Sequence, residues 1–142
     1  MWFTVLVGPA DVPDLAYAMP LEYLERLLLQ NEVFGDVISL EGVAQETGGI
    51  VIVTSQPNIT GNEVSGAHIL NFMLGQWFKP LRDLHLGRSG AMAFYRDLDE
   101  VAAFDGHPGN FVKDSEGRFL PIDLILVRAD DALQKALARF LD

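Results

Sequence analysis

The chain has 142 residues, of which 49% are hydrophobic and 21% charged, and this composition is typical of one globular domain with a buried core. Its 20 acidic residues outnumber its 10 basic ones, which gives a formal net charge of −10. This balance argues against a surface that binds nucleic acid or an anionic membrane, because such surfaces need clustered Lys and Arg.

Hydropathy and cysteine content restrict where the protein is expected to work. No window approaches the ~20 apolar residues that a membrane span requires. Residues 1–7 are apolar but lack the basic region and the cleavage site of a secretory signal. The chain has no cysteine, so it has neither disulfides nor thiolate metal sites. We therefore expect a cytoplasmic domain that makes no membrane contact.

The first part of the chain predicts a strand followed by a helix. Residues 1–7 form an apolar strand, and the proline-containing segment 10–19 predicts a loop. A helix is expected from Pro20 to Asn31, because proline suits a first helical turn and leucine recurs at helical spacing. The leucines of this expected apolar stripe are Leu21, Leu24, Leu27 and Leu28.

The middle of the chain predicts a hairpin and a second helix. Apolar strands at 37–44 and 50–56 are joined by a turn that contains two glycines, so an antiparallel hairpin is the economical interpretation. After a polar segment, a helix is expected from about 63 to 77. Lys79 and Pro80 are expected to end it, and residues 81–90 are expected to form a loop.

The last part of the chain predicts strands at 91–96 and 101–105, a loop at 106–110 and a hairpin that turns at 114–117. A C-terminal helix capped by Asp130 or Asp131 follows. Because strands follow one another through short turns, the predicted fold class is α+β, with a small antiparallel sheet beside the first helix. A doubly wound parallel sheet would contradict this prediction.

Two acidic side chains and one carboxamide are expected to converge at one end of this sheet. Asp105 ends a strand, Asn110 ends the loop, and the hairpin returns the chain to Asp123. Each residue alone also has a purely structural interpretation, since Asp-Gly and Pro-Gly-Asn are ordinary turn sequences and aspartate is a common cap. His107 is interpreted as a residue that braces the loop.

The spacing of these three residues matches that of the aspartate, the asparagine and the metal-binding aspartate of kinases. The form D-G-H-P-G-N followed by P-I-D resembles the pattern of aminoglycoside-phosphotransferase-type kinases and of bacterial or phage polyvalent-protein kinase domains. The resemblance implies that Asp105 is a catalytic base, that Asn110 and Asp123 bind Mg²⁺, and that ATP is the phosphate donor. Phosphoryl transfer needs such a carboxylate and hard oxygen ligands.

A second block, P-L-E-Y-L-E-R-L…N-E-V-F-G-D-V-I-S-L-E-G-V, resembles the first lobe of the polyvalent-protein kinase domains. The two blocks together imply that 1–142 is a single reduced kinase-like domain. Residues from about 1 to 57 would correspond to the first lobe, and those from about 58 to 142 to a reduced helical and hairpin second lobe. Glu22 or Glu25 would be the helix glutamate of the cofactor site.

The chain departs from the kinase pattern in its phosphate-binding parts. It has no glycine-rich loop, and its first lysine, Lys79, follows the expected hinge. Two interpretations stay open. One is a degenerate, pseudokinase-type binding module, with or without retained Mg²⁺-nucleotide binding. The other is an active minimal or partner-completed ATP-dependent phosphotransferase. Because a lobe that lacks strands leaves sheet edges uncovered, we also expect a homodimer or a protein partner, through residues 1–7.

Overall fold

The computed structural model of the chain describes residues 2–35, 38–55 and 64–141 and shows the predicted α+β fold. The helices are α1 (Pro20–Phe34), α2 (Gly66–Gly75) and α3 (Asp131–Ala138), and single 3-10 turns are η1 (Pro9–Asp11) and η2 (Pro108–Asn110). The strands are β1 (Phe3–Val7), β2 (Pro13–Tyr17), β3 (Ser39–Glu46), β4 (Gly49–Ser55), β5 (Lys79–Leu81), β6 (Met92–Arg96), β7 (Val101–Gly106), β8 (Phe111–Lys113), β9 (Phe119–Pro121) and β10 (Ile125–Arg128). Within these residues, no helix is both long and apolar enough to cross a bilayer.

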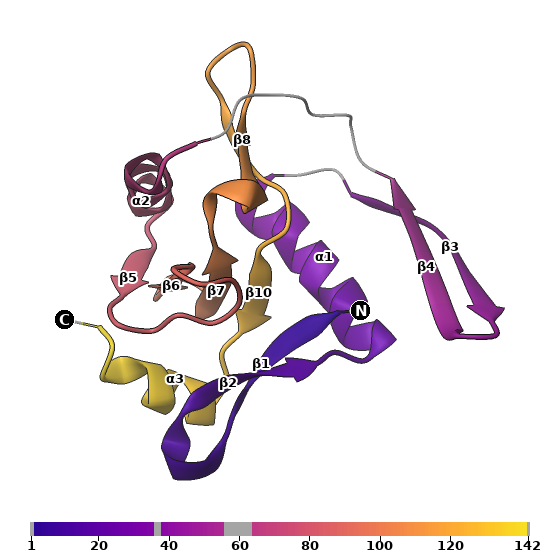
Figure 1. Cartoon of the computed structure of the whole chain (residues 1–142), viewed down its shortest axis with the longest axis horizontal. Helices are drawn as coiled ribbons and strands as arrows, with labels where there is room; N and C mark the ends of the chain where they lie inside the picture. The colour runs from indigo at the N-terminus through magenta and orange to yellow at the C-terminus, as the bar shows by residue number, and fades with distance from the viewer. Residues whose placement is uncertain (1, 36–37, 56–63, 142) are drawn as a thin grey trace.

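The centre of the fold is a four-stranded antiparallel sheet in the order β10-β7-β6-β5 (Figure 1). Four consecutive residues of β7, from Val101 to Phe104, have no exposed surface. An uninterrupted apolar run is expected where both faces of a strand are covered, and here α1 and α2 contribute to the core on one face while β1 and α3 contribute on the other. The strand that leads to the predicted site is therefore the most deeply buried part of the sheet.

Helix α1 is longer than predicted and buries a different face. It continues to Phe34 because Gly35 is the first residue to adopt the left-handed conformation, at φ 69°, that ends it. The core receives Leu29, Gln30 and Val33 from α1. Leu21 and Leu28 are exposed, so the prediction that the leucine-rich stripe forms the core face was wrong for these two. Not all leucines of the helix lie on its buried face.

Two segments that were predicted as loops or helix ends form edge strands. Residues 13–17 form β2, which pairs with β1 along its whole length, and Lys79, Pro80 and Leu81 form β5 at the edge of the central sheet. Both strands contain proline, which argued against a strand in the sequence. Proline is tolerated at a strand end or on a sheet edge, where its missing N–H is not needed.

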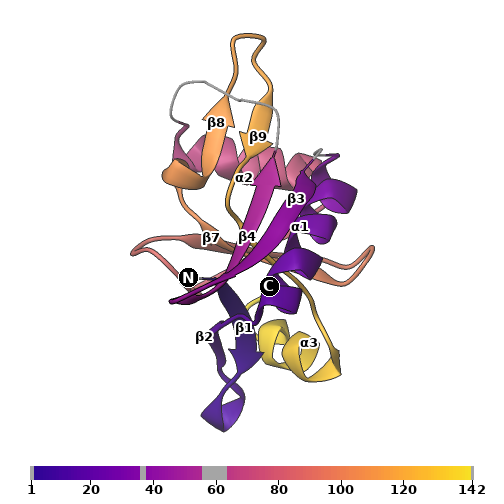
Figure 2. The same ribbon diagram turned by 90° about the vertical axis from the view of Figure 1, so that its right-hand side faces the viewer.

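The hairpin β3–β4 is formed as predicted over the described residues, with Gly49 at φ 125° in its turn. It stands to one side of the molecule, next to α1, outermost in Figure 1 and in front of the other elements in Figure 2.

Helix α2 begins at Gly66 with Ser65 as its cap, and ends at Gly75, earlier than predicted. Helix α3 is capped by Asp130 as predicted, through the Leu133 N–H. The expected polar segment 58–62, the expected strand start at 37 and strand end at 56, and the expected helix start near 63 lie outside the described residues.

Candidate functional site

Asp105 lies at a distortion of the central sheet. Between the pairs Met92–Gly106 and Phe94–Ala103 the register of β6 and β7 shifts, so β7 carries one extra residue there. Asp105 adopts φ 61°, in the left-handed region that residues other than glycine rarely adopt. Such bulges and strained residues occur often beside active sites, where they redirect a side chain. Here the distortion is located at the residue that the sequence singled out.

The side chain of Asn110 and the backbone of Arg88 hold Asp105 in this conformation. The Asn110 Nδ2 group donates hydrogen bonds to the Asp105 carbonyl oxygen at 2.8 Å and to its Oδ2 at 3.2 Å. Both partners are acceptors, which fixes the orientation of the carboxamide. The other carboxylate oxygen, Oδ1, accepts the backbone N–H of Arg88 at 3.0 Å. Both oxygens of Asp105 are therefore already hydrogen-bonded within the protein.

His107 braces the loop, as interpreted from the sequence. It is buried, and its Nδ1 accepts the backbone N–H of Gly109 at 3.1 Å. Its Nε2 lies 3.6 Å from Oδ1 of Asp105. A Cβ atom at Gly109 would fall 2.9 Å from the His107 ring, so the loop needs glycine there. The ring of His107 therefore fits the loop because Gly109, two residues later, has no side chain.

The hairpin β8–β9 returns the chain to the loop as predicted. The backbone N–H of Ile122 donates to the carbonyl oxygen of Asn110 at 2.9 Å. Asp105, Asn110 and Asp123 consequently line one hollow of about 520 Å³, together with Phe3, Leu15, Gly87, Arg88, His107, Gly109 and Ile125.

The carboxylate of Asp123 is paired with an arginine of α1. Arg26 Nη2 lies 2.6 Å from Asp123 Oδ1; the arginine side chain is 12% exposed and the aspartate side chain 69%. The guanidinium also lies over the ring of Tyr23, 5.5 Å from its centroid. The ring of Trp2 stacks on the same tyrosine, with the two ring centroids 4.8 Å apart. A second hollow of about 330 Å³, lined by these four residues and by Asp105, adjoins the first.

Arg26 is the functional residue that the sequence did not reveal. It lies 97 positions from Asp123 in the chain, and no local pattern connects the two. Arg88 was placed only in a loop, although its backbone amide holds Asp105. Neither contact has a signal in the sequence, because each depends on how the elements pack against one another.

Glu22 and Glu25 lie away from the other predicted site residues. They line another groove, of about 820 Å³, between α1, β1, β10 and α3, which shares Arg26 with the hollow at Asp123. The Glu22 carboxylate accepts the backbone N–H of Met19 at 2.8 Å, so it caps the first turn of the helix. Among the described residues that line the hollows at Asp105, none is a lysine. The structure therefore separates the helix glutamates from Asp105, Asn110 and Asp123.

The carboxylate oxygens of Asp105 and Asp123 that could bind Mg²⁺ face nitrogen donors of the protein. Mg²⁺ needs oxygen ligands at about 2.0–2.1 Å in nearly ideal geometry. Here the Asn110 amide nitrogen and Arg88 face Asp105, and a guanidinium faces Asp123. In the described part of the chain, no three His, Asp or Glu side chains are grouped closely enough to hold a metal ion.

No family model matches the chain, and neither the curated proteins nor the solved structures give a match.

Proposed function

We propose that this chain is a reduced kinase-like domain that acts as a binding module and does not transfer phosphate. The observation that carries this proposal is the ion pair between Arg26 and Asp123. By the resemblance, Asp123 holds the metal ion, yet its carboxylate is already neutralised by the protein's own cation. A divalent ion has to displace the guanidinium before it can use this oxygen.

Charge adds a second argument for a binding module. Nucleotide phosphates are anions, and the chain has a formal net charge of −10. Phosphotransferases offset the phosphate charge with a lysine and with metal ions, but Lys79 is paired with Asp97 at 2.7 Å instead. The same charge disfavours nucleic acid. A protein is therefore the partner class that we propose.

The alternative function is an ATP-dependent phosphotransferase, and the conformation of Asp105 favours it. A carboxylate held at φ 61° beside a hollow is a candidate for orienting an attacking hydroxyl group. Asp105 would be the catalytic base, and Asn110 and Asp123 would hold Mg²⁺ with ATP. Glu22 and Glu25 would have no direct part, since they line a different groove.

Incubation of the purified chain with ATP and Mg²⁺ distinguishes the two functions. The parent and Asp105→Asn are compared for ADP release and, by intact mass, for phosphate gained by the chain or by an added partner. A binding module gives the same background ADP release for both proteins. ADP release that Asp105→Asn abolishes would establish the phosphotransferase and overturn the proposal. Thermal unfolding with and without nucleotide shows whether a ligand binds at all, since 100 times the Kd stabilises by ~2.7 kcal/mol.

A further inference from the structure

The hairpin β3–β4 exposes apolar side chains on both of its faces. Their exposed fractions are 53% for Leu40, 57% for Val43, 47% for Ile50, 38% for Val51 and 49% for Val53. Successive residues of a strand point to opposite faces, so neither face of the ribbon is polar. A two-stranded hairpin is marginally stable in water unless more strands or a packed face support it. The hairpin β3–β4 is therefore as apolar as a buried element, although it is exposed.

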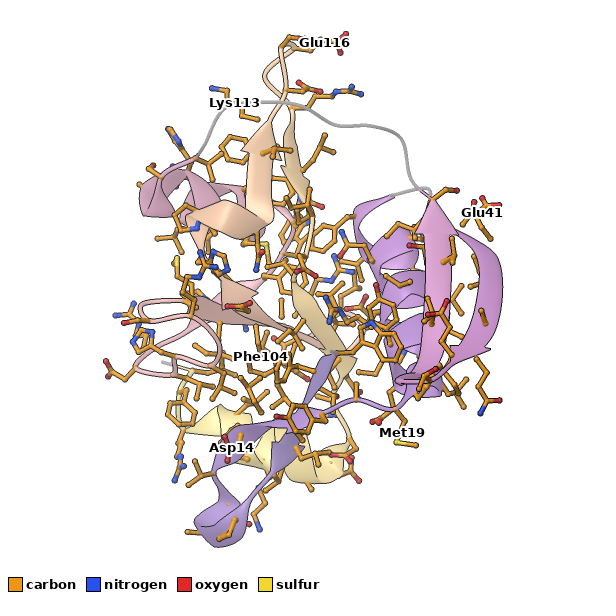
Figure 3. All side chains as sticks on the ribbon, turned by 45° about the vertical axis from the view of Figure 1, so that its right-hand side comes forward. Asp14, Met19, Glu41, Phe104, Lys113 and Glu116 are labelled. Carbon is orange, nitrogen blue, oxygen red and sulfur yellow. The ribbon has the colours of Figure 1, made fainter. Side chains whose placement is uncertain are left out.

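The two edges of the hairpin differ in charge. In the described part of the chain, β3 and β4 pair only with each other, so each has one edge without a ladder partner. Strand β3 carries Glu41 and Glu46, and Glu41 projects away from α1 in Figure 3. Strand β4, with the sequence GIVIVTS, has no charged residue and no proline of its own, although its last residue, Ser55, donates a hydrogen bond from Oγ to the carboxylate of Glu41. Because charges and prolines are what normally protect a sheet edge, the edge of β4 is unprotected from Gly49 to Thr54.

We propose that β4 pairs with β4 of a second copy of this chain, antiparallel about a two-fold axis at Ile52. From Gly49 to Thr54, strand β4 brings no charge to such a contact, so the paired strands meet over these residues without like-charge repulsion. Val51 of each copy then faces Val53 of the other, an apolar cross-strand pair. The result is a continuous four-stranded sheet whose outer edges are the glutamate-bearing β3 strands, which stops growth at two copies.

A second copy is one of the partners expected from the sequence, but the strand through which it pairs differs from the expected one. Association through residues 1–7 was expected, but one edge of β1 is taken by β2 from Phe3 to Val7. A cationic peptide is disfavoured as an occupant, because β4 has no carboxylate with which to select it. The proposal does not depend on what binds at Asp105.

The dimer is expected to be weak and to strengthen with salt. A seven-residue strand is ~24 Å long, so the contact belongs to the small, reversible class of interfaces. Each copy carries a formal net charge of −10, and salt screens the repulsion between the two. The mass in solution should rise from 15.7 kDa towards twice that value as protein concentration and salt increase.

A charge swap on β4 tests both the contact and its register. Val51→Lys with Val53→Lys places like charges opposite each other twice, and should weaken dimerisation about tenfold. Val51→Lys with Val53→Glu changes the same two positions, but sets Lys opposite Glu and should restore the dimer. Sedimentation equilibrium of the parent and both variants gives the three affinities, and circular dichroism confirms that each is folded.

Three results would overturn the proposal. The first is a parent that stays at 15.7 kDa at every concentration and salt. The second is a Lys/Glu variant that dimerises no better than the Lys/Lys variant, because a shared loss of apolar surface would then explain both. The third is a mass that continues to rise beyond two copies, which would show that the edge of β3 is not protected.

Discussion

Gly87 packs directly against Asp105. A Cβ atom at position 87 would lie 2.9 Å from the Asp105 Cβ and 2.6 Å from its Cγ, and Gly87 itself adopts φ 104°. The loop before β6 and the bulge of β7 therefore fit together only because position 87 has no side chain. The candidate site depends on this glycine as much as on its polar residues.

Gly87→Ala should destabilise the fold by more than ~1 kcal/mol, since alanine is strained at positive φ and the methyl group overlaps Asp105. Urea unfolding measures the change. Gly66→Ala is the matched control, because no atom lies within 4 Å of its added Cβ and its φ is not positive. The control should be neutral or stabilising by up to ~1 kcal/mol. Equal effects at both positions would contradict the close packing of Gly87 on Asp105.

Asn110→Ala should cost ~1–3 kcal/mol of unfolding free energy, because the Asp105 carbonyl loses its 2.8 Å partner in a buried setting. Asn110→Asp keeps the size of the side chain and replaces the donor with a second carboxylate beside Asp105. Asn110→Asp should be less stable than Asn110→Ala at pH 7. This gap in unfolding free energy should close as the pH falls below about 4, where carboxyl groups become protonated. A gap that does not change with pH would argue against the contact.

Asp99 provides a pH dependence outside the site. The side-chain hydrogen bond from Arg96 lowers the pKa of Asp99 below its usual 3.8, with the two groups 2.6 Å apart. A depressed pKa in the folded state contributes stability that is present above pH 3.8 and lost as the pH falls through the lower folded value. Asp99→Asn should therefore be less stable than the parent at pH 7, with a difference that shrinks towards pH 3. The measurement is the urea midpoint of the parent and of Asp99→Asn between pH 7 and pH 3. A difference that stays constant with pH would show that the ion pair does not contribute to stability.

Removing Arg26 should make the carboxylate of Asp123 available to a cation. Arg26→Gln deletes a unit charge next to Asp123, and because this carboxylate is 69% exposed, the attraction that is lost is about 1 kcal/mol. We expect Mn²⁺, measured by electron paramagnetic resonance, to bind Arg26→Gln at least about fivefold more tightly than the parent. Arg26→Gln with Asp123→Asn should return to the parent value. Asp123→Asn alone should leave the fold intact, because the residue is exposed. No gain in Mn²⁺ affinity on loss of Arg26 would remove the main support for the proposed binding module.

The sequence predicted the elements whose signals are local. The apolar run of β7 and the glycine-containing turn of β3–β4 are encoded within a few residues, and both formed as expected. The placement of Asn110 beside Asp105 is local too. Strand β2 was missed because its proline suggested a loop, and the fact that it is an edge strand became apparent only from its pairing with β1.

The remaining features depend on contacts between distant segments. The face of α1 that becomes buried depends on where the sheet lies, so the leucine pattern alone misplaced Leu21 and Leu28. The pairing of Arg26 with Asp123 requires that α1 and the end of the β8–β9 hairpin meet. No periodicity along the chain encodes such a meeting, and it is the contact that most affects the interpretation of the site.

The stack of Trp2 on Tyr23 has a spectroscopic consequence. The ring planes are 15° apart, and the same tyrosine contacts the guanidinium that holds Asp123. The other tryptophan, Trp77, is 78% exposed, and its replacement by phenylalanine would leave Trp2 as the sole indole fluorophore. Emission from that single ring would then change whenever Arg26 leaves its aspartate, so the protein carries its own optical reporter for the ion pair that supports its proposed function.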